Sequence, residues 1–593
     1  MSGYTAPIDD MRFVINELCD LQSLGHLPGY ADATPDLVDA ILEEAGKLAA
    51  DVLAPLNHDG DVEGCHIDNG VVRTPKGSKE AYAQFVEGGW NSVPFDPEFG
   101  GQGLPWLIST ALSEMWNSAN MAFSLCPLLT QGAVDLLSAH GSEQLKAKFL
   151  EKMVTGEWNG TMNLTEPQAG TDLARVRTKA ERDGKNYRIT GQKIFITYGE
   201  HDMTDNIIHL VLARVPGAPA GIKGISLFVV PKFLVNDDGS PGDRNDLRCV
   251  SIEHKLGISA SPTAVMSFGD NDGAIGYLVG EENNGIRCMF TMMNNARLAV
   301  GLQGVAIGER AFQQARNFAR ERVQSRAANS EDPAPVKIIH HPDVKRMLMS
   351  MKARTEAARA LSYYTAAKLD IAKRHLDDDE RSKAQGLVDL LIPVVKAWST
   401  DNGIDISSTG IQIHGGMGYI EETGAAQHMR DSRIAAIYEG TNGIQAIDLI
   451  GRKVAREKGK TVKILMADID DVIKQLCATG DDSLAVIADR LGEALLGLGK
   501  ATDWIVENYT RDIDKTLAVA VPYLTLLGNT AGGWMMASAA LSAVRSDANG
   551  TFNKAKVATT RFYADHVLTD VSGLCEKVTR GGSSITEIGV DEI

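Results

Sequence analysis

The feature that most constrains the fold is the hydrophobic period, which changes twice along the 593-residue chain. From Asp9 to about Asn159, segments such as "PDLVDAILEEAGKLAADVLAPL" repeat apolar residues every three or four positions, as amphipathic helices do. Between about Gly160 and Asp272, short runs such as "NIIHLVLARV" alternate with turn residues and indicate a compact β domain. Helical periodicity then returns. The sequence therefore predicts an α+β fold that is mostly α.

Chain length and composition shifts suggest four domains. A chain of this size holds several domains at roughly 100–200 residues each. We expect an N-terminal helical domain over residues 1–159 and a middle β domain over residues 160–275. Residues 276–455 and 456–593 are expected to form two further helical domains, separated near the charged stretch "GRKVAREKGK".

Charge and cysteine usage exclude several classes of protein. The formal net charge is -18, so no nucleic-acid partner and no attraction to anionic membranes are expected. The seven cysteines show no C-x-x-C spacing, which argues against a zinc site and a disulfide framework and favours a reducing compartment. Neither a signal peptide nor a peroxisomal signal is recognised at the ends. We therefore expect a cytoplasmic protein without a bound metal.

One uncharged stretch, Thr516 to Val544, is long enough to span a bilayer. Pro522, Asn529 and a pair of glycines interrupt it, and alanine supplies much of its apolar content. We expect two closely packed, buried helices here rather than an integral membrane span.

Two segments could contact a flat or anionic ligand. In "MNLTEPQAGTDLARV", Thr165, Gly170 and Thr171 offer hydroxyl and backbone donors, although the same residues also suit the turns of a linker. In "GQKIFITYG", the ring of Phe195 could form the wall of a cofactor site while the Thr197 hydroxyl bonds the cofactor edge. Core packing alone would explain these strand residues, and for an isolated strand it is the better explanation.

Glycines and arginines further along the chain are weaker signals. "QIHGGMGY" fits neither a phosphate-binding P-loop nor a dinucleotide fingerprint, and its His414 is better explained as a packed side chain. Arg297 and Arg322 lie on a segment rich in glycine and alanine, which allows helices to approach closely. Either guanidinium could bind a phosphate or carboxylate, and either could simply be solvated.

The segment "IAAIYEGTNGIQ" places one carboxylate, Glu439, in an apolar run beside a glycine. Together with "TEPQAGTD", "GQKIFIT", "EHKLGISASPTA", "QIHGGMGY" and "MRDSRIAAIYEGTNGIQ", it resembles the ordered signature blocks of FAD-dependent acyl-CoA dehydrogenases. The resemblance covers about Pro94 to Ala455. The N-terminal extension and the extra helical C-terminus further resemble a long bacterial subfamily.

The resemblance implies the acyl-CoA dehydrogenase fold: an N-terminal helical domain, a middle β-barrel-like domain, a C-terminal four-helix bundle and an additional helical domain. It implies that Glu439 removes the α-proton of an acyl-CoA thioester while the β-hydrogen passes as hydride to the flavin, giving a trans-2-enoyl-CoA. Some members carry the base immediately before the residue matching Arg297, where this chain has Ala296. Arg297, Tyr438 and Gly440 complete the expected substrate site.

Cofactor contacts follow from the resemblance as well. The positions that match FAD-contacting residues are Met162, Leu164, Thr165, Thr171, Phe195, Thr197, Arg322, Gln412, Gly416 and Thr441. Of these, Arg322, Gln412 and Gly416 match residues that reach the FAD of a neighbouring subunit, so a homodimer or homotetramer is expected. Electron-transfer flavoprotein is the expected electron acceptor. Phe195 stands where tryptophan is usual, and Tyr198 where asparagine is usual.

The acyl group is the least constrained expectation. The resemblance of the full-length layout to the long bacterial subfamily implies a short acyl-CoA, and specifically 3-methylmercaptopropionyl-CoA, oxidised to 3-methylthioacryloyl-CoA in dimethylsulfoniopropionate demethylation. A short- or medium-chain fatty acyl-CoA dehydrogenase and an acyl-CoA oxidase, which passes electrons to oxygen, are the alternatives. A non-catalytic helical scaffold would need neither the carboxylate nor a flavin.

Overall fold

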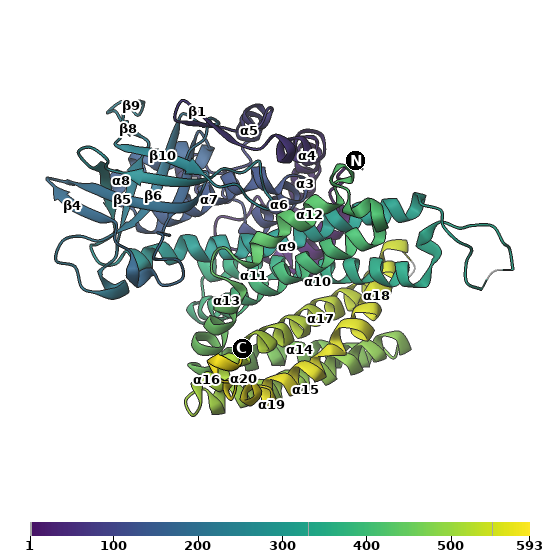
Figure 1. Cartoon of the computed structure of the whole chain (residues 1–593). Coiled ribbons are helices and arrows are strands. Elements are labelled where there is room, and N and C mark those ends of the chain that lie inside the picture. The colour runs from purple at the N-terminus through teal and green to yellow at the C-terminus, as the bar shows by residue number, and fades with distance from the viewer. Residues whose placement is uncertain (1–2, 330, 548–549) are drawn as a thin grey trace. The chain divides into compact units, whose positions relative to one another are not determined.

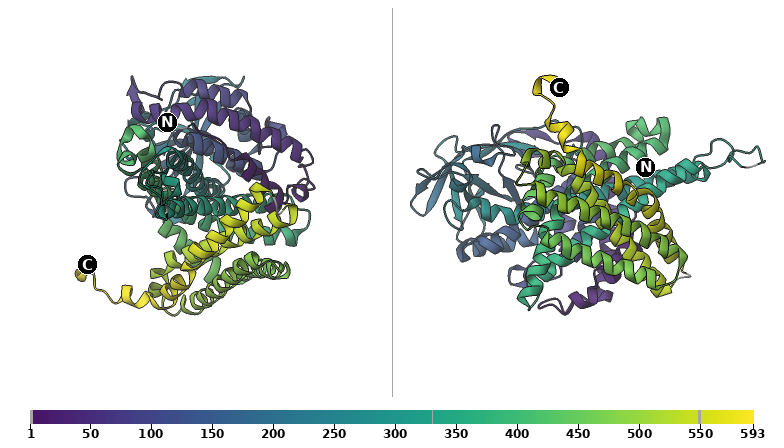
Figure 2. Two further views of the ribbon diagram at one scale, coloured as in Figure 1. Left: turned by 90° about the vertical axis from the view of Figure 1, so that its right-hand side faces the viewer. Right: turned by 90° about the horizontal axis from the view of Figure 1, so that it is seen from below.

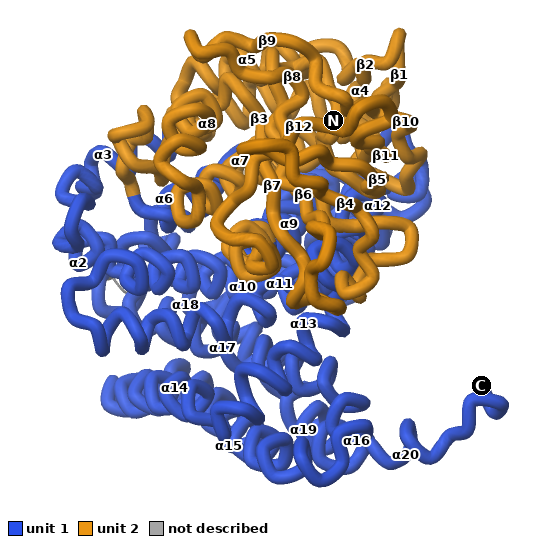
Figure 3. Tube along the Cα trace, turned by 90° about the vertical axis from the view of Figure 1, so that its left-hand side faces the viewer, with its two compact units in different colours: residues 1–43, 105–114, 297–593 blue, residues 44–104, 115–296 orange. Residues whose placement is uncertain are grey.

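The computed structural model describes residues 3–329, 331–547 and 550–593, and its elements are labelled in Figure 1. The chain forms two compact units (Figure 3). Unit 1 comprises residues 1–43, 105–114 and 297–593, and unit 2 comprises residues 44–104 and 115–296. Each unit contains residues that pack together, including segments far apart in the sequence. The division into four domains stays a prediction.

Unit 2 contains the β-sheet and the helices that precede it. Its helices are α4 (Ala54–Glu63), α5 (Ser78–Glu87), α7 (Met121–His140) and α8 (Glu143–Thr155), with the ends of α3 (Pro35–Leu48) and α6 (Trp106–Ala119) and the start of α9 (Gly285–Glu321). Its strands are β1 (His66–Asp68), β2 (Val71–Arg73), β3 (Trp158–Asn163), β4 (Lys179–Asp183), β5 (Asn186–Thr197), β6 (Asn206–Ala213), β7 (Ser226–Pro231), β8 (Phe233–Val235), β9 (Pro241–Arg244), β10 (Leu247–Ile252), β11 (Thr263–Phe268) and β12 (Ala274–Val279).

Eight of these strands form one sheet in the order β10-β11-β5-β12-β7-β6-β3, with β4 also paired to β5. The β3–β6 pair is parallel and the other pairs are antiparallel. Alternating residues such as Ile189, Val211, Phe228 and Met266 meet in its core because side chains alternate between the two faces of a strand. The predicted order of helices, then strands, then helices is confirmed.

Among the described residues, α7 is the helix long and apolar enough to cross a membrane. Its most apolar 18-residue window is 89% buried, and it packs on β3 and α8 within unit 2. Burial by protein accounts for its apolar composition, as in a core helix.

Unit 1 is helical. Its elements are α1 (Ile8–Phe13), α2 (Leu21–Leu24), the rest of α9, α10 (Pro342–Arg374), α11 (Asp378–His414), α12 (Ala425–Ser432), α13 (Asn442–Asp448), α14 (Lys460–Ala478), α15 (Asp482–Asn508), α16 (Ile513–Ala518), α17 (Ala520–Asp547), α18 (Thr551–Tyr563), α19 (Asp570–Arg580) and α20 (Gly582–Thr586). Helices α10 and α11 lie side by side, and α17 packs against both of them and against α15, α18 and α19 (Figures 1 and 2).

Glycines set the close approach of α9 and α11. A Cβ atom at Gly304 would lie 2.1 Å from the carbonyl oxygen of Ser399, and one at Gly301 would lie 2.6 Å from that of Val395. Only residues without a side chain allow the two backbones to come this close. The small residues noted in the sequence therefore fix the spacing of the two helices that carry Arg297 and Lys396.

The expectation of two helices over Thr516 to Val544 is wrong, because α17 continues without a break through most of this stretch. Pro522 lies in its first turn, where the missing N–H costs nothing. Gly528 and Gly532 face the ring of Trp398, whose Nε1–H donates to the Asn529 side-chain oxygen at 2.9 Å. The glycines therefore make room for a neighbouring helix instead of ending this one.

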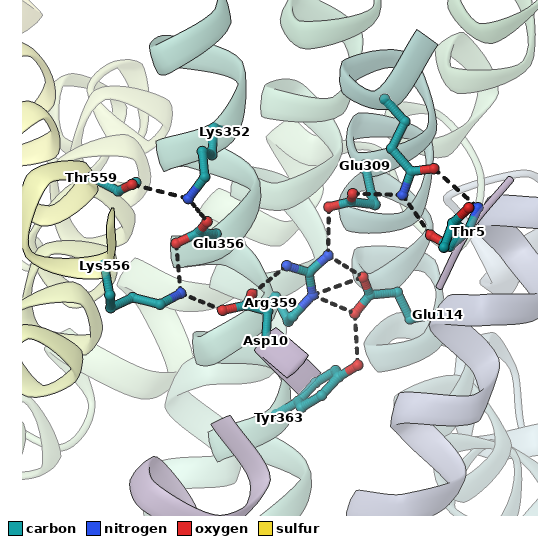
Figure 4. A network of polar contacts seen from close by, with 11 residues as sticks. Thr5, Asp10, Glu114, Glu309, Lys352, Glu356, Arg359, Tyr363, Lys556 and Thr559 are labelled. Atoms are coloured by element: carbon teal, nitrogen blue, oxygen red, sulfur yellow. Dashed lines mark hydrogen bonds and ion pairs between the residues drawn. The ribbon is translucent and has the colours of Figure 1, made fainter. Parts of the chain in front are cut away.

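A buried charge network joins five segments of unit 1 around Arg359, which is 1% exposed (Figure 4). Its guanidinium donates to Glu114 at 2.6 Å, to Glu309 at 2.8 Å and to Asp10 at 2.6 Å. Lys556 on α18 donates to the other oxygen of Asp10 and to the neighbouring Glu356 on α10. The network thus links α18 to α1 and to α10.

Candidate active site

Glu439 lies in a tight turn between the 3₁₀ turn Arg433–Ala436 and α13. Its φ is 58° and that of Gly440 is 83°, so both residues adopt the left-handed conformation. A glutamate rarely does so, at a cost on the order of 1–3 kcal/mol that the surroundings must sustain. Thr441 follows as the N-cap of α13 and bonds its first turn through the hydroxyl.

Two buried side chains hold the carbonyl groups of this turn. The ammonium of Lys396, on α11, donates to the Gly440 carbonyl at 2.9 Å and to the Asn442 side-chain oxygen at 2.8 Å. The amide of Gln445 donates to the carbonyls of Glu439 and Gly440 at 3.1 and 3.3 Å. The backbone of the turn is therefore fixed while the Glu439 carboxylate is left out of these bonds.

The surroundings of Glu439 favour its neutral form. Burial raises the pKa of Glu439 to about 7, although the nearby charges of Arg297 and Lys396 oppose the rise. The residue still keeps accessible surface, being only half-buried. A carboxylate with this pKa can accept a proton near neutral pH. An ordinary glutamate, with a pKa of about 4.3, does so poorly.

Two cations face the carboxylate from different helices. Arg297 on α9 is 7% exposed, and burial lowers its pKa while Asp448 and Glu439 act in the opposite direction. Lys396 is fully buried, and burial lowers its pKa to about 8 against the raising effect of Glu439 and Asp401. The site thus combines one acid with the charges of two buried cations.

Tyr438 lies beside the acid but its hydroxyl is engaged elsewhere, donating to the side-chain oxygen of the buried Gln303 on α9. Burial and the charge of Glu439 raise the pKa of Tyr438, so the phenol stays protonated. An open pocket of about 550 Å³ adjoins the turn and is lined in part by Asp401, Arg433 and Thr441. Thr441 therefore combines its capping role with a position on a pocket wall.

In unit 2, the end of β3 and the middle of β5 bring the first two cofactor segments together. The Ile194 N–H donates to the Thr165 carbonyl at 2.9 Å, and the Lys193 ammonium donates to the Leu164 carbonyl at 3.0 Å. Lys193 also pairs with Glu166 at 2.8 Å, and both side chains are buried. Burial lowers the pKa of Lys193 to about 8, which its ion pair with Glu166 resists.

Phe195 forms a bulge in β5. Ala264 pairs with Ile196 while Met266 pairs with Lys193, so β5 has one extra residue there, and the φ of Phe195 is 59°. Such a bulge re-aims the side chain, and the Phe195 ring is 59% exposed. Core packing, the alternative explanation for this residue, is therefore wrong.

The remaining residues of this face suit a flat ligand. Met162, Leu164, Thr165 and Thr197 are half-buried, and Thr171 is exposed. An exposed aromatic ring and half-buried hydroxyl-bearing residues on two hydrogen-bonded segments fit a heteroaromatic group such as the flavin of FAD. These residues are the ones that would hold it.

The last group of expected cofactor contacts lies at the far ends of α9 and α11. His414 is buried and stacks on Phe318 with ring centroids 4.5 Å apart, which confirms that it is a packed histidine. Arg322, Gln412 and Gly416 are exposed around it. At 1.5 Å per residue, Gln412 lies about 24 Å along α11 from Lys396. One chain therefore does not bring this group to Glu439.

The sequence alone did not point to Lys396, to its partner Asn442, or to Gln445, which bonds the same turn. The signal was present, because Lys396 is the one charge in the run "LLIPVVKAWS", and a lysine is rarely buried without a partner. Among the residues that the structure describes, no group of three or more His, Cys, Asp or Glu side chains could hold a metal ion.

Comparisons with known proteins agree with this geometry. "Acyl-CoA dehydrogenase, N-terminal domain" matches residues 36–157, the corresponding middle domain matches residues 161–271, and the C-terminal domain matches residues 283–455. "Acetyl-CoA dehydrogenase C-terminal like" matches residues 465–589.

Individual relatives extend over nearly the whole chain. The 3-methylmercaptopropionyl-CoA dehydrogenase of Ruegeria pomeroyi is 48% identical over 98% of this chain and 99% of its own. A butyryl-CoA dehydrogenase of Syntrophomonas wolfei is 36% identical over 96% of each chain. The solved structure of an acyl-CoA dehydrogenase complexed with FAD from Bacillus anthracis has a TM-score of 0.75 and 21% identity, covering 98% of this chain and 92% of that one, and supports the fold. The chain therefore belongs to the acyl-CoA dehydrogenase family of FAD-dependent oxidoreductases.

Proposed function

We propose that this enzyme oxidises a short acyl-CoA, 3-methylmercaptopropionyl-CoA, to 3-methylthioacryloyl-CoA, with Glu439 as the catalytic base. The observation that carries the proposal is the Glu439 turn: a half-buried carboxylate in the left-handed conformation, with a pKa raised to about 7 by burial. A strained residue of this kind is kept where a function needs its geometry.

In the proposed reaction, a Glu439 carboxylate oxygen takes the α-proton of the thioester. The electron pair of the broken Cα–H bond forms the Cα=Cβ double bond as the β-hydrogen leaves with its pair. Bound FAD supplies the acceptor for that hydride. The backbone N–H of Glu439 polarises the thioester oxygen, which makes the α-proton more acidic. Arg297 and Lys396 stabilise the carboxylate before it accepts the proton.

The substrate assignment rests on the Ruegeria pomeroyi relative, which shares 48% identity along nearly the full length. The Syntrophomonas wolfei relative makes butyryl-CoA the second candidate. The two acyl chains differ by one heavy atom, a sulfur within the chain. We therefore propose a pocket for a short chain and a place for the enzyme in dimethylsulfoniopropionate demethylation.

We also propose a cytoplasmic homodimer or homotetramer that passes its electrons to electron-transfer flavoprotein. The exposed tip that carries Gln412 and Gly416 also exposes Met417 by 53%, Tyr419 by 85% and Ile420 by 46%. Exposed apolar groups of this kind are typical of a contact between subunits. In the proposed oligomer, this tip lies at the cofactor of a neighbouring subunit.

The test is anaerobic mixing of the FAD-loaded enzyme with 3-methylmercaptopropionyl-CoA or butyryl-CoA while flavin absorbance is followed. Rapid bleaching by wild type, and its loss in Glu439→Gln at equal FAD content, is the expected result. Equal bleaching by both proteins would show that Glu439 is not the base. Oxygen uptake by the reduced enzyme then separates an oxidase from a dehydrogenase, for which slow uptake and fast reoxidation by electron-transfer flavoprotein are expected.

A further inference from the structure

We infer that Lys396 is a positioning residue for Glu439, holding the left-handed turn through the Gly440 carbonyl and facing the carboxylate with its charge. The inference rests on the proposed role of Glu439 and adds a second residue to it. It assigns a function to a buried lysine that is not among the expected cofactor or substrate contacts.

The ammonium is aimed by its own partners. It donates to the Gly440 carbonyl at 2.9 Å and to the Asn442 side-chain oxygen at 2.8 Å. The Asn442 amide nitrogen is fixed in turn by the Asp401 carboxylate at 2.7 Å and by the Thr400 hydroxyl at 3.0 Å. Asn442 must therefore present its oxygen to Lys396, and the third ammonium proton is left for the site.

The backbone of α11 at Lys396 is also held in place. Val395, the preceding residue on α11, lies so close to α9 that a Cβ atom at Gly301 would come within 2.6 Å of its carbonyl oxygen. The stem of Lys396 is fully buried. Ordering a long side chain normally costs conformational entropy. Here the packing of the helices already restricts the rotamers of Lys396, so less entropy is lost when its hydrogen bonds form. The packing of α9 against α11 therefore helps to hold Lys396 in the position from which it bonds Gly440.

A neutral donor would hold the turn equally well, so the charge needs its own explanation. The charged groups that face Glu439 are Arg297 from α9 and Lys396 from α11, with Tyr438 adjacent and protonated. Asp401 acts on Lys396 from α11. Burial favours the neutral acid, and Lys396 opposes it. Without this cation, the fraction of ionised Glu439 at neutral pH would fall.

The experiment measures anaerobic flavin reduction by 3-methylmercaptopropionyl-CoA as a function of pH in Lys396→Met and Lys396→Arg. In Lys396→Met we expect the maximal rate to fall about 100-fold, as misplacement of a catalytic group does. We also expect the acid limb of the rate to move up by about one pH unit, because an opposite charge has been removed. A lysine that only supported the fold would leave the acid limb in place.

Lys396→Arg keeps the charge but cannot reproduce both donor positions, so we expect a lower rate with an unmoved acid limb. Lys474→Met is the matched control, because Lys474 is exposed on α14 and pairs with Asp470 and Asp471 of the same helix; it should behave as wild type. FAD content and thermal midpoint are measured for every variant. If Lys396→Met does not fold, the pH profile of Lys396→Gln, which keeps a hydrogen-bond donor and removes the charge, is measured instead, and an acid limb at the wild-type position would overturn the inference.

The two proposals fail in different ways. A wild-type rate and acid limb in Lys396→Met, or a wild-type rate in Lys396→Arg, would overturn the inference about Lys396 while an inactive Glu439→Gln upholds the base. Bleaching of Glu439→Gln at the wild-type rate would overturn the proposed function itself.

Discussion

Lys556 donates a hydrogen bond to Asp10, a residue 546 positions earlier in the chain. Both side chains are buried in unit 1, and Lys556 also bonds Glu356 at 2.6 Å. Burial alone would raise the pKa of Asp10, but Lys556 and Arg359 outweigh it and lower that pKa. The added C-terminal helices thus supply a charge that the first helix of the chain needs.

We therefore expect Lys556→Met to destabilise the protein by about 3–5 kcal/mol, because it leaves a buried carboxylate without one of its partners. Chemical denaturation followed by circular dichroism measures the loss. The exposed Lys474→Met should change stability by no more than about 0.5 kcal/mol. The double variant with Asp10→Asn should lose less than the sum of the two single losses; additive losses would show that the pair is not coupled.

Gly304→Ala tests the spacing of α9 and α11. The added methyl group would meet the Ser399 carbonyl at 2.1 Å, so the helices must separate, at a cost of about 1–3 kcal/mol. We also expect slower flavin reduction, because these two helices carry Arg297 and Lys396.

Gly492→Ala on α15 is the matched control for this substitution. Nothing lies within 4 Å of the added Cβ atom at that position, and alanine is the better helix former by about 1 kcal/mol. Gly492→Ala should be neutral or slightly stabilising in the same denaturation assay. Equal destabilisation by the two substitutions would contradict the role of Gly304.

The candidate site could be predicted from the sequence only where a local motif carries the chemistry. The sequence points to Glu439 and Phe195 because each lies in a block that resembles a signature block of the family, and both roles stay predictions. Lys396 lies 43 residues before Glu439 in the chain, and its partner in the turn is a backbone carbonyl. No local pattern records a contact of this kind.

The fold shows the same division. Helical and strand periods predicted the order of elements, since they depend on neighbours three or two residues away. The course of α17 was predicted wrongly because its glycines read as breaks in the sequence. The glycines leave room for the ring of Trp398, which lies more than 100 residues earlier in the chain, so only the packed structure explains them.

Phe195→Ala should weaken FAD binding about tenfold, since one aromatic contact contributes about 1.4 kcal/mol. The substitution should leave the packing of the fold unchanged, because Phe195 is 59% exposed. Titration of the apoprotein with FAD, followed by flavin fluorescence, measures the affinity. Ile222→Ala removes another exposed apolar side chain from unit 2, 54% exposed, and should leave FAD affinity unchanged. Equal affinity in the Phe195 variant would remove that residue from the cofactor site.

The rate of flavin reduction should rise with pH through about 7 and level off above it, because Glu439 must be ionised to take a proton and burial raises its pKa to that value. The sign follows from the raised pKa: below about 7 the folded enzyme holds Glu439 as the neutral acid, which cannot act as a base. Stopped-flow reduction at saturating 3-methylmercaptopropionyl-CoA between pH 5 and pH 9 would measure the limb, and Glu439→Gln should show no such limb. A rate that stays flat down to pH 5, as the ordinary glutamate pKa of about 4.3 would give, would mean that the cations outweigh the burial of the carboxylate in the working enzyme.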